Sequence, residues 1–354
     1  MRKELGMLVA LFVLCFFIGR FNENFLGADN LENVTRQIAM LGIFSIGVSF
    51  VIITGGIDLS VGSVIGLSGV IIARVSAPVN DSGLTSGAGQ SIWLGISVAL
   101  TVAILIGLVQ GLLITRLKLQ PFIVTLAGML LIRGVSQTIT NGGNISFGAS
   151  TFRDLGDQGF ALPPGLPLLG GFSVPYPLLI FLVVALVTTY VLHFTVFGRH
   201  VYAIGGNRDA AAYSGVPVER VEALTYVISA GLAGLAGIPY AAYIGQMSHT
   251  VGEAYELAAI AAAVLGGCSL RGGEGTILGV FIGAAIMRVL DNGINMFKIA
   301  YTDADGSPAI WRLNENWRNI IIGAVILGAV ILDQGTHFLQ ERRRKRRVKG
   351  TPAP

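Results

Sequence analysis

Long apolar runs recur along the whole chain, and they constrain its fold more than any other feature. About ten runs are long enough to cross roughly 30 Å of hydrocarbon once tilt is allowed. Charged residues make up only 12% of the 354 residues, against about a quarter in ordinary soluble domains. The sequence therefore predicts an all-α integral membrane fold with spans near 5–19, 38–54, 60–77, 92–114, 122–139, 176–197, 223–244, 254–267, 276–297 and 319–332.

Glycine is frequent for a helical chain, with 48 residues. Small residues let helix backbones approach closely in lipid, so this content favours a packed bundle over loose spans. The first run is interpreted as an uncleaved span rather than a signal peptide, because no small-residue cleavage site follows it. The two cysteines, Cys15 and Cys268, give no basis for a disulfide framework, and the four histidines lack metal-ligand spacing, so no metal site is expected.

The distribution of basic residues predicts the orientation of these spans. With the N-terminus in the cytoplasm, 15 of the 24 Lys and Arg residues fall on the cytoplasmic side and six fall outside. The positive-inside rule then favours ten spans with both termini cytoplasmic. We expect one transmembrane domain over residues 1–341, followed by a basic tail over 342–354 that rests on anionic headgroups.

The same map assigns the loops to the two sides of the membrane. The loop 198–221 is expected in the cytoplasm, and the loops 79–91 and 140–175 are expected outside. The two external loops are either a face for a protein partner or connectors without one.

The stretch "AIGGNRDAAAYSGVP", residues 203–217, predicts a short helix outside the lipid. Asn207 can cap it, Asp209 suits its first turn, Gly215 can end it, and Pro217 prevents its continuation. About two helical turns are not stable alone in water, so the helix must pack against something. It either lies in the groove of another protein or rests on the bundle and the headgroups.

A carboxylate stands between two apolar spans in "ITGGIDLSVGSVIGLSG", residues 53–69. A charge is costly there unless it faces water, a partner or a helix end. Asp58 is therefore either a cap for the amides of Ser60 or Val61, or a substrate contact. The break between the second and third spans lies either inside the membrane or at its surface. A similar glycine pattern recurs in "LGGCSLRGGEGTILG", residues 265–279, as a weak signal of an internal repeat.

Other polar side chains fall within the spans. Arg133 lies in the fifth span, and Arg288 and Asp291 lie three residues apart in the ninth, where they can neutralise one another. Polar residues of this kind either line a pathway or join helices. The candidates for a substrate pathway are Asp58, Gln110, Gln137, Asn292 and Asn295.

Catalytic motifs are missing from the sequence. It contains no G-x-x-x-x-G-K-[ST], HExxH or G-x-S-x-G segment and shows no paired nucleophile and base. We therefore expect a protein that is not an enzyme and binds no cofactor of its own. Any ATP chemistry must belong to another chain.

Three segments together resemble the permease subunits of bacterial ABC importers for ribose and other simple sugars. They are "VIITGGIDLSVGSVIGL" at 51–67, "FGRHVYAIGGNRDAAAYSGVPVERV" at 197–221 and "AAVLGGCSLRGGEGTILG" at 262–279. The resemblance covers nearly the whole chain. The sequence departs from the family's usual residues at Gln110, Cys268, Arg271 and Glu274. These departures leave the family resemblance intact, but the identity of the sugar does not carry over from the family.

The resemblance implies a type II ABC importer fold in the bacterial inner membrane, with a second permease copy or a sister permease as dimer partner. It also implies two cytoplasmic ATPase subunits that bind ATP and Mg, and an extracytoplasmic binding protein that delivers a monosaccharide. The loop from Gly205 to Val218 is expected to hold the coupling helix that docks in the ATPase. The coupling residues expected there are Gly205, Gly206, Asn207, Asp209, Ala211, Ala212 and Gly215.

Two other functions remain open at this point. A related permease type imports branched-chain amino acids by the same ATP-driven route. An ion-coupled secondary carrier would instead use Asp58, or the Arg288 and Asp291 pair, as a proton or cation site.

Overall fold

The computed structural model describes residues 2–79, 86–163, 172–302 and 308–312, together with residues 317, 320–325, 327, 328 and 331. The chain divides into two compact units, residues 1–289 and 290–354. We describe each unit by itself. The basic tail 342–354 and parts of the predicted external loops, residues 80–85 and 164–171, lie outside the described residues.

Helices account for nine of the ten predicted spans. Among the described residues, seven helices are long and apolar enough to cross a membrane, and two further apolar helices are shorter. The tenth predicted span, 319–332, lies partly outside the described residues. The expectation of an all-α membrane protein is thus confirmed. The helices are α1 (Arg2–Phe21), α2 (Ala28–Ile53), α3 (Val61–Ser76), α4 (Ile92–Thr115), α5 (Pro121–Thr140), α6 (Asp154–Asp157), α7 (Tyr176–Phe194), α8 (Val196–Gly206), α9 (Arg208–Tyr213), α10 (Val218–Ile244), α11 (Tyr255–Leu265) and α12 (Ile277–Met296), with short 3-10 turns η1 (Glu23–Leu26) and η2 (Thr151–Arg153).

Helix α2 forms the centre of the first unit. All of its residues from Ala39 to Ile53 are buried, and α2 packs against α10, α7 and α11. Helices α1, α4, α5 and α7 instead expose most of their apolar side chains. A large exposed apolar area on a membrane helix faces lipid or a partner subunit. The first unit therefore has an inner layer around α2, α3 and α10 and an outer layer of strongly apolar helices.

Close helix packing explains part of the glycine content. A Cβ atom added to Gly107 or Gly111 of α4 would overlap the backbone of α10 at Tyr226 and Ala223. Glycine lets the two backbones approach at a distance that larger residues forbid. Because α10 also packs against α2 and α3, it links the outer helix α4 to the inner layer.

Three small antiparallel strand pairs occur among the described residues. β1 (Ile145–Ser146) pairs with β4 (Gln246–Met247), and β2 (Gly159–Ala161) pairs with β3 (Ser173–Pro175). In the second unit, β5 (Lys298–Thr302) pairs with β6 (Pro308–Arg312).

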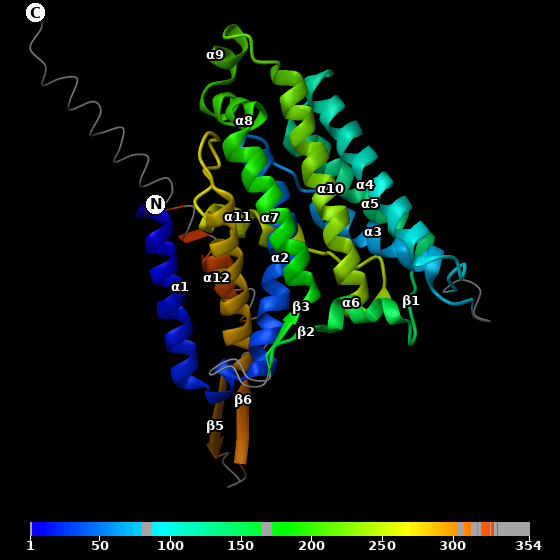
Figure 1. Cartoon of the computed structure of the whole chain (residues 1–354), viewed down its shortest axis with the longest axis vertical. Coiled ribbons are helices and arrows are strands. Elements are labelled where there is room, and N and C mark those ends of the chain that lie inside the picture. Colours follow the sequence, from blue (N-terminus) through cyan, green and yellow to red (C-terminus); the bar gives the residue numbers. More distant parts are fainter. Residues whose placement is uncertain are drawn as a thin grey trace, which may run out of the picture. The chain divides into compact units, whose positions relative to one another are not determined.

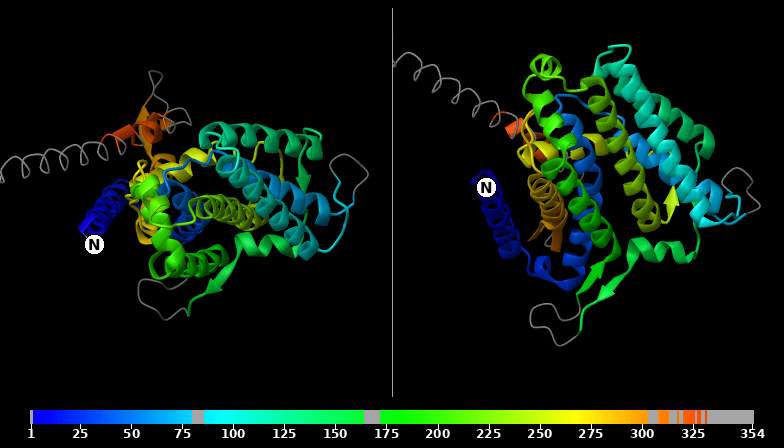
Figure 2. Two further views of the ribbon diagram at one scale, coloured as in Figure 1. Left: turned by 90° about the horizontal axis from the view of Figure 1, so that it is seen from above. Right: turned by 45° about the horizontal axis from the view of Figure 1, so that its top comes forward.

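The two long loops of the first unit lie at opposite ends of the helices. Helices α8 and α9 stand at the top of Figure 1, and α6, β1, β2 and β3 stand at the lower end of the same helices. The second view of Figure 2 shows the same separation. The loop 198–221, predicted on the cytoplasmic side, is therefore at the opposite end from the loop 140–175, predicted outside.

Candidate functional site

The predicted short helix is present as α9, and its caps are those that the sequence predicts. Asn207 has an extended backbone conformation, and its side-chain oxygen accepts a hydrogen bond from the Ala210 N–H at 2.9 Å. Gly215 follows the helix with φ +84°, a value that favours glycine. Pro217 then precedes α10. Helix α9 is thus a short helix, capped at both ends, between α8 and α10.

Two faces can be distinguished on α9. Asp209, Ala212 and Tyr213 are exposed, and the Tyr213 side chain reaches 93% exposure. Ala211 is only 5% exposed because it packs against the protein. Ala211 was predicted as a coupling residue, but in this structure it anchors α9 and does not belong to its accessible face. Gly206, Asn207 and Gly215 are exposed, and Gly205 is half-buried.

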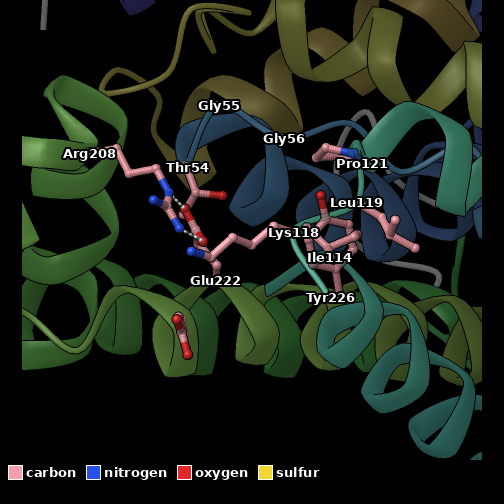
Figure 3. Close-up of a pocket in the computed structure, with 11 residues that line it drawn as sticks. Thr54, Gly55, Gly56, Ile114, Lys118, Leu119, Pro121, Arg208, Glu222 and Tyr226 are labelled. Carbon is pink, nitrogen blue, oxygen red and sulfur yellow. Dashed lines mark hydrogen bonds and ion pairs between the residues drawn. The ribbon is translucent and has the colours of Figure 1, made fainter. Parts of the chain in front are cut away.

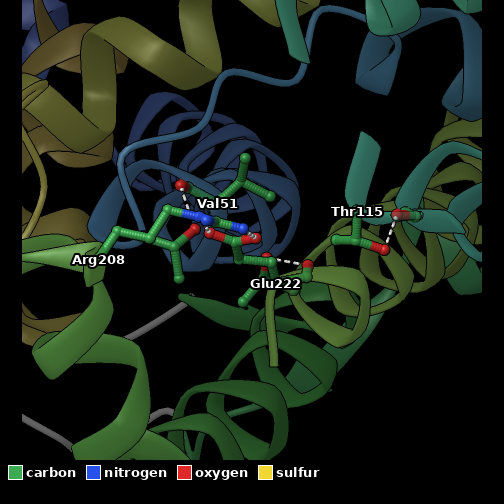
Figure 4. Close-up of polar contacts among 7 residues, drawn as sticks. Val51, Thr115, Arg208 and Glu222 are labelled. Atoms are coloured by element: carbon green, nitrogen blue, oxygen red, sulfur yellow. Dashed lines mark hydrogen bonds and ion pairs between the residues drawn. The ribbon is translucent and has the colours of Figure 1, made fainter. Parts of the chain in front are cut away.

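A bidentate ion pair joins α9 to α10. Arg208 Nε donates to Glu222 Oε1 at 2.7 Å, and Arg208 Nη2 donates to Glu222 Oε2 at 3.0 Å (Figure 4). The hydrogen bonds to Glu222 raise the pKa of the Arg208 guanidinium above its usual value. Two parallel charge-assisted bonds fix orientation as well as distance. The sequence analysis does not predict this pair, because Arg208 and Glu222 lie 14 residues apart in different helices.

The end of α8 meets two distant segments at a junction of glycines. The Gly273 N–H donates to the Ile53 carbonyl at 2.8 Å, and a Cβ on Gly205 would overlap both the Ile53 oxygen and the Gly273 nitrogen. Gly272, with φ +85°, packs against Gly205 as well. We call Ile53, Gly205, Gly272 and Gly273 the glycine junction. It brings together the three segments that the sequence singled out separately.

A buried polar network lies deeper in the first unit. Asp58 is fully buried, and its carboxylate accepts bonds from Ser60 N at 2.9 Å, Ser60 Oγ at 2.7 Å and Ser229 Oγ at 2.7 Å. Gln110 Oε1 lies 3.1 Å from the same Ser60 hydroxyl. We call Asp58, Ser60, Gln110 and Ser229 the Asp58 network. Its geometry supports the capping interpretation of Asp58, because the Ser60 amide precedes α3.

Only two of the five predicted pathway residues, Asp58 and Gln110, come together in this network. Gln137 is exposed on α5. Asn292 and Asn295 belong to the second unit, as does Asp291. Arg288 belongs to the first unit and donates to the Tyr240 hydroxyl at 3.2 Å. A role in the substrate pathway therefore stays a prediction for all five candidate residues.

A pocket of about 450 Å³ is lined by both residues of the ion pair. Figure 3 shows Arg208 and Glu222 on one side of it and Ile114, Leu119 and Tyr226 on the other. The Tyr226 side chain is 2% exposed, and its hydroxyl has no hydrogen-bond partner in the described part of the chain. The remaining lining residues are Thr54, Gly55, Gly56, Lys118, Pro121 and Glu219. Among the described residues, no group of three or more His, Cys, Asp or Glu could hold a metal ion.

Removal of the α9 cap is expected to loosen this helix alone. The change Asn207→Ala deletes the acceptor for the Ala210 amide, which typically costs about 1 kcal/mol of helix stability. Hydrogen exchange of the α9 amides should accelerate about fivefold, while amides in the middle of α10 exchange as before. Asn207→Asp keeps an acceptor and should stay near the wild-type rate. Equal exchange in Asn207→Ala and wild type would contradict the capping role.

Comparisons with known proteins agree with the membrane architecture. The family model described as "Branched-chain amino acid transport system / permease component" matches residues 30–330. The chain is 36% identical to the ribose import permease protein RbsC of Escherichia coli K12 over 331 residues, which covers 93% of both chains. It is 32% identical to the xylose transport system permease protein XylH of Haemophilus influenzae, covering 92% of this chain and 95% of that protein.

A third relative carries the transporter class in its name. The inner membrane ABC transporter permease protein YjfF of Escherichia coli K12 is 36% identical over 311 residues, covering 88% of this chain and 85% of that protein. No solved structure matches this chain at a significant level.

Proposed function

Because the chain belongs to the family of ABC importer permeases that includes the ribose and xylose permeases, we propose that it is the transmembrane subunit of an ATP-driven monosaccharide importer. The multi-pass membrane location is shared with these relatives and fits the seven long apolar helices. The observation that carries the proposal is identity over nearly the full length to permeases of two different sugars. The partners proposed are ATPase subunits that bind ATP and Mg, a second permease and an extracytoplasmic sugar-binding protein.

Helix α9 is proposed as the element that docks in the ATPase, with its exposed face around Asp209, Ala212 and Tyr213 as the contact. A capped helix held by an ion pair moves as a unit, whereas an irregular loop would absorb a displacement. The small side chains of this face suit a groove in another protein.

Helix α10 is proposed as the element that carries the motion inward. It holds Glu222, which binds Arg208 of α9, and Ser229, which binds Asp58. These two residues lie seven positions apart, or about 10 Å along the helix. A shift of α9 therefore moves α10 through the bond to Glu222. The same movement of α10 displaces Ser229, and with it the Asp58 network, two helical turns further along. The glycine junction offers a second route, from α8 into the end of α2 and the loop 266–276.

The transport of branched-chain amino acids remains a second candidate, since the description of the family model names them. The experiment that separates the two is purification of the chain with its native partners, followed by a thermal-shift screen on the associated binding protein. We expect an ATPase and a binding protein to copurify, and D-ribose or D-xylose to raise the melting temperature of the latter. A shift with L-leucine and none with any sugar would contradict the proposed substrate class.

A further inference from the structure

An ion pair lies between two segments that are far apart in the sequence. Arg133 Nη1 of α5 lies 3.3 Å from Glu253 Oε1, and the two side chains are 23% and 65% exposed. Glu253 belongs to the non-helical segment 248–254 that joins β4 to α11. The Asp58 network and the proposed coupling residues do not include either residue.

Glycine contacts place the segment 248–254 deep within the first unit. A Cβ on Gly66 of α3 would overlap the Val251 carbonyl oxygen, and a Cβ on Gly62 would overlap the Gly252 oxygen. Gly62 stands fourteen residues before Ser76, where α3 ends, which corresponds to about 21 Å along the helix. With Ser76 placed at the edge of the hydrocarbon layer, which is about 30 Å thick, the chain next to Glu253 lies inside that layer.

Lipid cannot be the medium that Glu253 faces at this depth. Irregular backbone within the hydrocarbon region occurs only where protein buries it or where it lines water. Charged side chains there face a bundle interior or a water-filled cavity. Arg133 lies seven residues before the end of α5, about 10 Å along the axis, and helical side chains lean toward the N-terminus, which directs Arg133 further inward. A carboxylate that is 65% exposed at this depth therefore faces either water or a polar surface of a partner subunit, and the proposal below rests on the first of these.

Unsatisfied polar atoms accompany the pair. Glu256, at the start of α11, is 8% exposed, and its Oε2 has no hydrogen-bond partner in the described part of the chain. Arg133 Nη2 lacks one as well. Glu256 follows Glu253, the ion-pair partner of Arg133, by three residues, and an unpartnered donor together with an unpartnered acceptor matches a hydroxyl group, which both accepts and donates. A buried polar atom without a partner is costly unless a ligand or water satisfies it.

We propose that Arg133, Glu253 and Glu256 line a water-filled passage through the membrane and there bind hydroxyl groups of the transported sugar. The choice of a neutral polyol rests on the proposed function, and the mixture of one cation and two carboxylates disfavours an anionic substrate. These residues bind the sugar only weakly. Because only a few hydrogen bonds hold it, the sugar dissociates quickly.

The test is cysteine accessibility in the full-length protein, assembled with its partners and reconstituted in proteoliposomes. Glu253→Cys is compared with Leu131→Cys, a position on α5 that is 71% exposed and two residues from Arg133. Both are made in a Cys15→Ser background, since Cys268 is buried. A charged, membrane-impermeant methanethiosulfonate reacts with thiolates in water and not with thiols in lipid. We expect Cys at position 253 to react at least tenfold faster than Cys at 131.

Sugar protection completes the test. D-ribose or D-xylose, whichever the wild-type complex imports, should slow the reaction at position 253 severalfold, and the additional change Glu256→Gln should weaken that protection. Reaction at 253 as slow as at 131 would overturn the water-filled passage. Fast reaction that the imported sugar does not slow would overturn the sugar contact. The proposed function is tested separately by sugar import into proteoliposomes with the wild-type complex. If that import does not depend on ATP, the proposed function itself is wrong.

Discussion

Replacement of Gly205 by alanine is expected to abolish ATP-driven uptake. The added Cβ would overlap the Ile53 carbonyl oxygen and the Gly273 nitrogen, and these two atoms are hydrogen-bonded to each other, so the Cβ must displace both segments of backbone. Overpacking of this kind typically costs about 1–3 kcal/mol, and here it also separates α8 from α2 and the loop 266–276. Uptake in proteoliposomes and the melting temperature of the purified protein measure the two consequences.

The neighbouring glycine supplies a matched control. A Cβ on Gly206 would meet nothing within 4 Å, so Gly206→Ala should keep the melting temperature of the purified protein within a few degrees of wild type. Both variants replace one glycine in the same helical turn by alanine. The loss of backbone entropy in the unfolded chain is therefore the same for the two. Equal behaviour of the two variants would contradict the role of the glycine junction.

Reversal of one charge in the ion pair between α9 and α10 is expected to uncouple ATP hydrolysis from uptake. In Arg208→Glu, two carboxylates face each other where Arg208 and Glu222 now form bonds of 2.7 and 3.0 Å. Because Arg208 is 55% exposed, water screens the pair, and a loss of about 1–1.5 kcal/mol is expected, equivalent to roughly tenfold. The number of ATP molecules hydrolysed per sugar imported should rise by about that factor.

The double exchange Arg208→Glu with Glu222→Arg restores opposite charges at the same two positions. It should recover most of the coupling, since the α9 cap and the packing of Ala211 are unchanged. The exchange Arg116→Glu with Glu219→Arg is the control, and it should leave the ratio of ATP hydrolysed to sugar imported unchanged. That pair is 3.9 Å apart, and both side chains are more than half exposed. Failure of the double exchange to recover any coupling would show that the residues act independently of their bond.

Local features of the fold could be predicted from the sequence. Asn207 and Gly215 enclose α9 because capping depends on residues within one helical turn, and the apolar runs locate the helices because the bilayer sets their length. Helix α2 begins at Ala28, ten residues before the predicted span 38–54, and its first turns are polar. The pattern of apolar residues locates the part of a helix that lies in lipid, but it does not show whether the helix continues into water as a polar segment.

Contacts between distant segments could not be predicted in the same way. The glycine junction joins Ile53, Gly205 and Gly273, and each glycine alone resembles an ordinary loop residue. Asp58 and Gln110 were both named as candidates, but their link through Ser60 depends on how α3 and α4 pack. Arg133 was noted in the sequence, whereas its partner Glu253 lies in a segment that no helical pattern marks.

The central claim is that this chain imports a monosaccharide at the expense of ATP hydrolysed by partner subunits. The most direct measurement is uptake of radiolabelled D-ribose and D-xylose into proteoliposomes that contain the purified complex, with ATP supplied on the side of α9. We predict uptake of at least one of the two sugars that requires ATP, persists when a protonophore removes the proton gradient, and is not reduced by excess L-leucine. Uptake that follows the proton gradient without ATP, or that L-leucine abolishes, would contradict the account.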